Sequence, residues 1–206
     1  MMEDVVEADP YSSDKDLWKG WNAYSGSGEV TAEIIYANYG RKEDFEKLQD
    51  MGVDISGKIV IARYGGNFRG YKAKFAEAAG AIGLIIYTDP IDSGYFKGLV
   101  YPEGPYYSES TIQRGSLLTE DFTGDPLTPY EPALPLDGKI KIKRKQPVDA
   151  QLHSIPVTPI GYGAAKEILG QMNGDVVPEG WQGGLPFTYR LQGGSALKVF
   201  LEVNQP

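Results

Sequence analysis

The fold is decided by Gly57-Lys-Ile-Val-Ile-Ala-Arg-Tyr-Gly-Gly-Asn-Phe-Arg-Gly-Tyr-Lys-Ala-Lys-Phe-Ala-Glu-Ala-Ala-Gly-Ala-Ile-Gly-Leu-Ile-Ile-Tyr-Thr-Asp-Pro90. Two compact apolar runs, 58–62 and 81–87, have the length of buried strands, and apolar residues at helical spacing lie between them. Gly80 predicts the end of that helix. Two buried strands joined by a helix of this length predict a parallel pair with a right-handed crossover.

The helix of this unit carries one unusual charge. Its apolar face runs from Phe68 to Ala79, and we expect the stem of Lys72 at the edge of that face. Arg69 stands at the N-terminal end, where a cation opposes the helix dipole. A bound anion would reverse that balance, whereas an arginine, by residue type alone, more often points into solvent.

The same patterns predict the remaining elements. Strands are indicated over 29–38 and 196–203, an extended segment over 155–160, and short amphipathic helices within 38–49 and over 161–172. The fold class is therefore α/β, in the sense of a mixed α+β domain whose sheet is flanked by two or three helices.

Composition limits the classes of function. At 206 residues the chain predicts one domain, or two at most, and 41% hydrophobic with 23% charged residues is typical of a folded protein. The net charge of −8 argues against nucleic acid, because such binders carry a basic face. The one basic run, 139–145, alternates lysines with Ile140 and Ile142. This alternation is typical of an edge strand with its lysines in water.

The ends and the residue types missing from the chain add further limits. No run reaches the roughly 18 apolar residues of a membrane span. Residues 1–22 lack periodicity and are interpreted as an irregular lead-in or as the boundary of a cloned fragment, and residues 23–206 as the folded domain. The lack of cysteine excludes disulfides and thiolate metal sites but leaves the compartment open.

Two common kinds of catalytic site do not fit. The loop Gly65-Gly-Asn-Phe-Arg-Gly70 opens a helix, but Tyr71 and Lys72 stand where a phosphate loop needs Lys and then Ser or Thr. A catalytic zinc site takes about three protein ligands, usually including several His or Cys. One histidine and no cysteine argue against a zinc centre, and His153 is interpreted as a surface or turn histidine.

Residues 91–136 show no sustained periodicity, and so long an irregular loop is more often functional than idle. The turn cluster Gly124-Asp-Pro-Leu-Thr-Pro129 lies within it. Asp125 and Thr128 supply oxygens of the kind that calcium prefers, although a turn-stabilising role is the default. Two oxygens are too few for calcium, so a site here needs donors from elsewhere.

Six motifs occur in the order found in one family: Tyr36-Ala-Asn-Tyr-Gly-Arg-Lys-Glu-Asp-Phe45, Ser56-Gly-Lys-Ile-Val-Ile-Ala-Arg-Tyr-Gly65, Phe68-Arg-Gly70, Gln113-Arg-Gly115, Gly124-Asp-Pro-Leu-Thr-Pro129 and Ser154-Ile-Pro-Val-Thr-Pro-Ile-Gly161. Over roughly residues 20–206 the chain resembles the protease-associated, or apical, domain of the glutamate carboxypeptidase II (prostate-specific membrane antigen) family of zinc peptidases, to which the transferrin receptor is related. The resemblance implies a β/β/α domain with a central βαβ unit.

The resemblance also implies roles for single residues. Arg69 matches the arginine that pairs with the α-carboxylate of the substrate's C-terminal residue. Ser116 falls where the carboxypeptidase has an asparagine at the same substrate pocket, so glutamate specificity is not carried over. Thr128 and the backbone around Glu131 match part of a structural calcium site, whose other ligands are two glutamates of the peptidase domain. The family's two zinc ions also lie in that domain.

From this resemblance we expect an accessory substrate-recognition and lid domain of a zinc-dependent exopeptidase, with loop 91–136 as its wall. The isolated chain should hold no zinc, be catalytically silent, and bind calcium weakly or not at all. Its partners would be the peptidase domain of the same parent chain, a peptide substrate and, in the parent, a second subunit, with no nucleic acid and no membrane. The implied location is extracellular or in the cell envelope.

Two alternatives from other classes stay open. One is a non-catalytic receptor-like ectodomain module for ligand binding or dimerisation. The other is a free-standing anion-binding α/β protein, which requires the gene to end near Pro206. Arg69 favours the peptidase branch, because the resemblance includes an arginine there that the receptor branch lacks.

Overall fold

The computed structural model describes residues 2–133, 135, 139, 141–146 and 149–205. Its centre is a five-stranded sheet with the strand order β8-β4-β3-β2-β9. The strands are β2 (Gly28–Tyr36), β3 (Ile59–Arg63), β4 (Gly83–Tyr87), β8 (Val157–Ile160) and β9 (Lys198–Val203). The first four run parallel, and β9 pairs with β2 in antiparallel register. All ten residues of β3 and β4 are buried, as expected of parallel strands covered on both faces.

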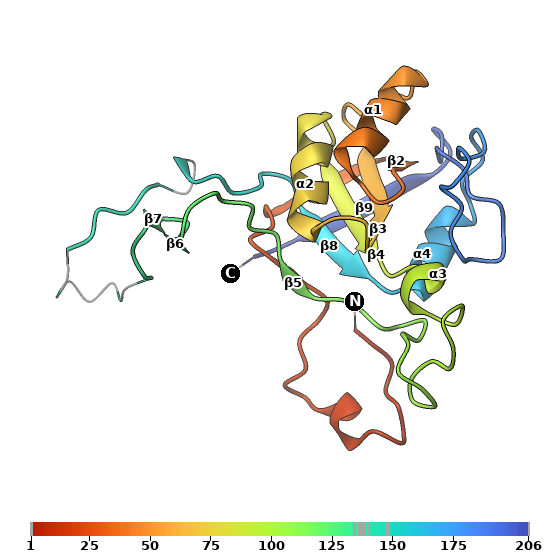
Figure 1. Cartoon of the computed structure of the whole chain (residues 1–206), viewed down its shortest axis with the longest axis horizontal. Coiled ribbons are helices and arrows are strands. Elements are labelled where there is room, and N and C mark those ends of the chain that lie inside the picture. The colour runs from red at the N-terminus through yellow and green to blue at the C-terminus, as the bar shows by residue number, and fades with distance from the viewer. Residues whose placement is uncertain (1, 134, 136–138, 140, 147–148, 206) are drawn as a thin grey trace.

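The three predicted helices are present, and two short ones, α3 and η1, are additions. They are α1 (Lys42–Asp50), α2 (Arg69–Ala78), the single turn α3 (Pro90–Ser93), α4 (Tyr162–Leu169) and the 3₁₀ helix η1 (Pro10–Ser13). In Figure 1, α1 and α2 lie next to each other over the sheet. The predicted β3–α2–β4 unit is confirmed, and β3 pairs with β4 from Ile59 opposite Gly83 to Arg63 opposite Tyr87. The left-handed φ of +86° at Gly80 ends α2.

The predicted irregular loop carries several short strands. They are β5 (Gly115–Ser116), which pairs in parallel with β1 (Asn22–Ala23) from the N-terminal part of the chain, and β6 (Gly124–Asp125), which forms a hairpin with β7 (Thr128–Pro129). In Figure 1 the segment that bears β6 and β7 extends away from the sheet. Among the described residues, no helix is long and apolar enough to cross a bilayer.

The strand predicted over 139–145 is wrong where the structure describes it. Lys139 and residues 141–145 belong to no strand, and Ile140 lies outside the described residues. The backbone N–H of Lys145 donates to the Leu127 carbonyl at 2.8 Å, and its ammonium lies 5.5 Å from the centre of the Phe122 ring. A strand needs a neighbouring edge as well as an alternating pattern, and no strand of the described residues pairs with this stretch.

Candidate functional site

The N-terminus of α2 has no side-chain cap. The chain turns from β3 into α2 through Gly65 and Gly66, whose φ angles of +95° and +74° suit glycine. Phe68 is the N-cap, so no side chain caps the first turn, and no acidic residue lies in that turn. The free N–H groups and the positive end of the helix dipole therefore remain without a negative partner from α2 itself.

Arg69, the first residue of α2, is partly exposed and is held by several contacts. Its Nη2 donates to the side-chain oxygen of Gln113 at 3.2 Å, and its Nη1 donates to the Ser116 carbonyl at 3.4 Å. The guanidinium carbon lies 5.4 Å from the centre of the Phe68 ring and 5.7 Å from that of Tyr64. Nε is buried, and among the described residues it has no hydrogen-bond acceptor. The guanidinium is thus oriented, and no carboxylate of the described residues pairs with it.

Two glycines let α2 and β5 approach each other. A Cβ on Gly70 would lie 2.1 Å from the Leu117 carbonyl oxygen, and a Cβ on Gly115 would lie 2.5 Å from Nη1 of Arg69. Both distances are well inside van der Waals contact. The guanidinium therefore occupies the space that a side chain at position 115 would fill.

A second layer fixes the backbone beside Arg69. The hydroxyl of Tyr64, one residue past β3, donates to the Gln113 carbonyl at 2.7 Å. The Asn22 amide donates to the Tyr64 hydroxyl and to the Gly115 carbonyl, each at 3.3 Å. Burial raises the pKa of Tyr64, although the Asn22 hydrogen bond and the charge of Arg69 oppose the shift. Tyr64 therefore stays a neutral donor, and residues 113–115 are held against β3.

The two substrate residues named from the resemblance lie together. Ser116 meets Arg69 through its backbone carbonyl, while its own hydroxyl accepts the Leu118 N–H at 3.1 Å. Sequence reasoning assigned no role to Tyr64 or Gln113, although both stand inside the quoted motifs. Their contact spans 49 residues, so no local spacing could have shown it.

The residues of the expected partial calcium site also come together. The buried hydroxyl of Thr128 lies 3.5 Å from Asp125 Oδ2, 3.5 Å from the Glu131 carbonyl and 3.4 Å from the Pro132 carbonyl. These are hard oxygen donors of the kind that suits calcium, but they are fewer than the six to eight that calcium takes. Within the described ranges, no three His, Cys, Asp or Glu side chains gather where they could hold a metal.

His153 is not a surface histidine, so that prediction is wrong. It is only 8% exposed, and its ring nitrogens lie 3.3 Å from Glu77 Oε2 and 3.1 Å from the Leu117 carbonyl oxygen. The segment before β8 therefore packs against both α2 and Leu117, the residue that follows β5. The imidazole links these two parts of the chain.

Lys72 also departs from its predicted position at the edge of the apolar face, because it is fully buried. Its ammonium donates to the Tyr39 carbonyl, to the Gly65 carbonyl at 2.7 Å and to Asn67 Oδ1 at 2.6 Å. Hydrogen bonds from this buried ammonium therefore hold the loop 65–67, which leads to Arg69, in place.

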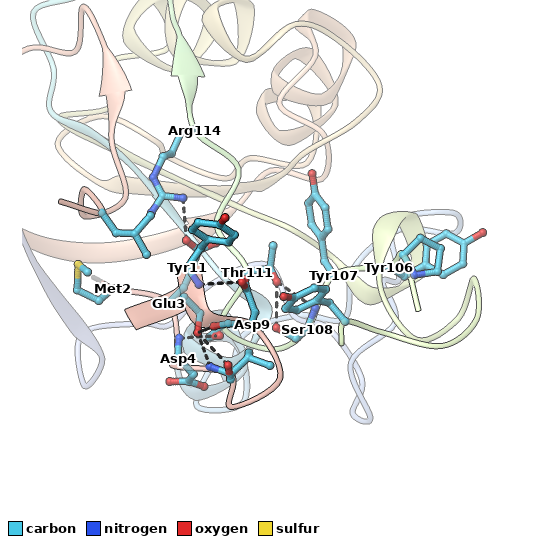
Figure 2. Close-up of a pocket in the computed structure, with 16 residues that line it drawn as sticks. Met2, Glu3, Asp4, Asp9, Tyr11, Tyr106, Tyr107, Ser108, Thr111 and Arg114 are labelled. Carbon is cyan, nitrogen blue, oxygen red and sulfur yellow. Dashed lines mark hydrogen bonds and ion pairs between the residues drawn. The ribbon is translucent and has the colours of Figure 1, made fainter. Parts of the chain in front are cut away.

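A separate cavity of about 380 Å³ lies between the lead-in and residues 101–114 (Figure 2). The carboxylate of Glu3 accepts the Ile112 N–H at 2.8 Å and pairs with Arg114 Nη1 at 2.9 Å. Arg114 also donates to the Trp18 carbonyl at 2.7 Å. These contacts of Glu3 and Arg114 hold residues 2–22 next to Gln113. The predicted domain boundary at residue 22 stays a prediction.

Comparison with known proteins identifies the family. The PA domain model matches residues 27–118. A glutamate carboxypeptidase 2 homolog of Caenorhabditis briggsae is 42% identical over 189 residues, which cover 89% of this chain and 24% of that protein. This chain carries the PA domain of the glutamate carboxypeptidase family. Aminopeptidase NAALADL1 of Rattus norvegicus shares 35% identity over 182 residues, covering 87% of this chain and 24% of its own length. Transferrin receptor protein 2 of Mus musculus shares 33% identity over 178 residues, which cover 85% of this chain and 21% of that protein.

The PA domain of this chain spans about a quarter of the length of these relatives. In the relatives named as peptidases it is therefore one part of a much larger chain. An accessory domain of a peptidase is what the comparisons support.

Proposed function

We propose that this PA domain recognises peptide substrates for a zinc-dependent exopeptidase domain of the same parent protein, and that Arg69 binds the C-terminal carboxylate of the peptide. The observation that carries the proposal is the oriented, unneutralised guanidinium at the uncapped N-terminus of α2. A carboxylate there would satisfy both the arginine and the positive end of the helix dipole. Loop 91–136, with Ser116, would form the wall beside it.

The parent protein would supply the catalytic metals. Two zinc ions would be held by the peptidase domain, and the zinc would activate water for peptide hydrolysis. A structural calcium would be shared between that domain and Thr128 with the Glu131 backbone, whose oxygens suit it in kind but not in number. The same proposal includes an extracellular or cell-envelope location for the parent.

Replacing Arg69 with alanine tests the carboxylate clamp in the full-length parent. We expect KM for peptides with a free C-terminus to rise about 10- to 100-fold, because a hydrogen bond to a charged group contributes about 1.5–3 kcal/mol. Peptides amidated at the C-terminus should be cleaved equally by both proteins. Steady-state kinetics on matched free and amidated peptides measures this.

The exposed Lys74 of α2 provides the matched control. Lys74→Ala removes one positive charge from the same helix and should leave both KM values within about twofold of wild type, as an exposed charge is screened. Equal KM values for Arg69→Ala and wild type on free peptides would contradict the clamp.

Calcium dependence tests the shared site. We expect 1 mM calcium to stabilise the isolated chain by less than about 0.4 kcal/mol, the value for a Kd of 1 mM, because most ligands are missing. The parent should gain far more, and Thr128→Val should remove part of that gain. Thermal unfolding with calcium or with chelator measures both proteins. A large stabilisation of the isolated chain would show a complete site within it.

A receptor-like module without catalysis is the second candidate, and the similarity to transferrin receptor protein 2 favours it. The gene around this segment distinguishes the two. Several His with Asp and Glu ligands in the adjoining domain support the peptidase, and their loss supports the receptor.

A further inference from the structure

Gln113 is the side chain that competes for Arg69. Because Nε of Arg69 is buried, a carboxylate can reach the guanidinium only at its two terminal nitrogens. Each of those nitrogens carries two N–H groups. One on each already donates, to the Gln113 amide oxygen at 3.2 Å and to the Ser116 carbonyl at 3.4 Å, so a carboxylate that binds both nitrogens meets these two oxygens at the guanidinium. The Ser116 oxygen belongs to the backbone of β5 and cannot turn away. The Gln113 amide is on a side chain with rotatable bonds, and it is partly exposed.

We propose that Gln113 is an internal stand-in for the substrate carboxylate, which holds Arg69 in its binding position and is displaced when a carboxylate arrives. The proposal rests on the function proposed for Arg69. Its chemistry is a difference in acceptor strength: a carboxylate oxygen forms a charge-assisted hydrogen bond that is roughly twice as strong as one to a neutral amide oxygen. The carboxylate is therefore the stronger acceptor of the two and displaces the glutamine.

The surroundings keep the stand-in in place. The Gln113 backbone is fixed by the Tyr64 hydroxyl at 2.7 Å. On its two sides, Ile112 and Arg114 are both bound by the carboxylate of Glu3. The Gln113 side chain can therefore swing while its backbone stays beside Arg69. Residue 113 consequently sets the affinity of the site, and a charged side chain there would keep the site permanently filled.

Gln113→Glu and Gln113→Ala test this in the isolated chain, with N-acetyl-L-glutamate as the probe. A tethered carboxylate has an effective concentration in the millimolar range or above, so Gln113→Glu should weaken probe binding at least about tenfold. Gln113→Ala removes the neutral competitor, while the Ser116 carbonyl and the rings of Phe68 and Tyr64 still orient Arg69, so probe binding should strengthen about two- to fivefold. Titration followed by the backbone ¹⁵N–¹H NMR signals of Gly70 and Tyr71, which every variant including Arg69→Ala retains, measures both. Gln49→Glu, an exposed site on α1, adds the same charge elsewhere and should match wild type.

A ligand-free measurement keeps the test decisive when the probe binds too weakly to detect. In Gln113→Glu the introduced carboxyl should titrate well below its usual pKa, and adding Arg69→Ala should restore the usual value. An ordinary pKa in both variants overturns the stand-in. Probe binding that is lost in Arg69→Ala but unchanged in Gln113→Glu overturns the stand-in and leaves the clamp intact. Probe binding unchanged in Arg69→Ala overturns the clamp itself.

Discussion

Asp89→Ala is expected to destabilise the domain by about 3–5 kcal/mol, because it removes a buried charge together with all its hydrogen bonds. Asp89 follows β4 and is fully buried. Its Oδ1 accepts the N–H groups of Ile91 at 3.0 Å and Gly184 at 2.7 Å. Its Oδ2 accepts the hydroxyls of Tyr87 at 2.8 Å and Tyr189 at 2.7 Å. Alanine would leave these four donors buried without an acceptor.

The same carboxylate joins parts of the chain that are far apart. It caps α3, where loop 91–136 begins. It also holds residues 183–185 through the Gly184 N–H, and a Cβ on Gly183 would lie only 2.0 Å from its Oδ2. Burial and the charge of Asp89 raise the pKa of Tyr189, so its hydroxyl stays a donor across the ordinary pH range. Loss of Asp89 should therefore loosen the wall as well as lower stability.

Asp54→Ala is the matched control for Asp89. Like Asp89, Asp54 accepts the backbone N–H of the residue two positions later, here that of Ser56 at 3.0 Å. Unlike Asp89, it is exposed. We expect a cost of at most about 1 kcal/mol, in the range of an exposed cap. Urea unfolding of both variants gives the comparison. Equal losses would show that burial of the Asp89 network adds nothing.

The central part of the fold could be predicted from local pattern. Strands β3 and β4 come from continuous apolar runs, and α2 comes from apolar residues at helical spacing. Both patterns are properties of residues close in sequence, so they can be recognised without knowing how the rest of the chain folds. The alternation over 139–145 failed for the opposite reason. A strand depends on a partner edge, whereas Lys145 contacts the segment that bears β6 and β7, which extends away from the sheet (Figure 1).

The candidate site could be predicted only in part. The sequence alone isolated Arg69 as a cation in an unfavourable position, and its pairing with Ser116 came from the family resemblance. Its contact with Gln113 spans 44 residues and depends on the close approach of α2 to β5. His153 and Lys72 were misjudged for a related reason: residue type predicts exposure, but each found buried partners that only the tertiary fold supplies.

Lys72→Met is expected to cost about 3 kcal/mol at neutral pH, because three oxygens lose their donor. They are the carbonyls of Tyr39 and Gly65 and the side chain of Asn67. Methionine fills a similar volume, so the packing loss is small by comparison. Since Gly65 and Asn67 belong to the loop that enters α2, the substitution should also disturb the position of Arg69.

The pH dependence of this loss follows from the environment of Lys72. Burial lowers the pKa of its ammonium to about 7 from 10.5, against the opposing charge of Asp44, and Arg41 lowers it further. Between these two pH values the unfolded chain binds more protons than the folded domain, so the stability contributed at Lys72 rises with pH. The three oxygen acceptors favour the charged ammonium and so raise its pKa, but the loss of hydration on burial lowers the pKa by more.

Wild type should therefore gain stability relative to Lys72→Met as pH increases, by about 2 kcal/mol between pH 7 and pH 9, since one pKa unit corresponds to 1.36 kcal/mol. Below pH 7 the difference should be constant, because the lysine is protonated in both states. Urea unfolding at pH 6, 7, 8 and 9 measures it, and Lys74→Met, an exposed lysine of the same helix, should show no such trend. A difference between wild type and Lys72→Met that does not change with pH would mean that the ammonium keeps its charge throughout, and that its three oxygen partners outweigh its burial.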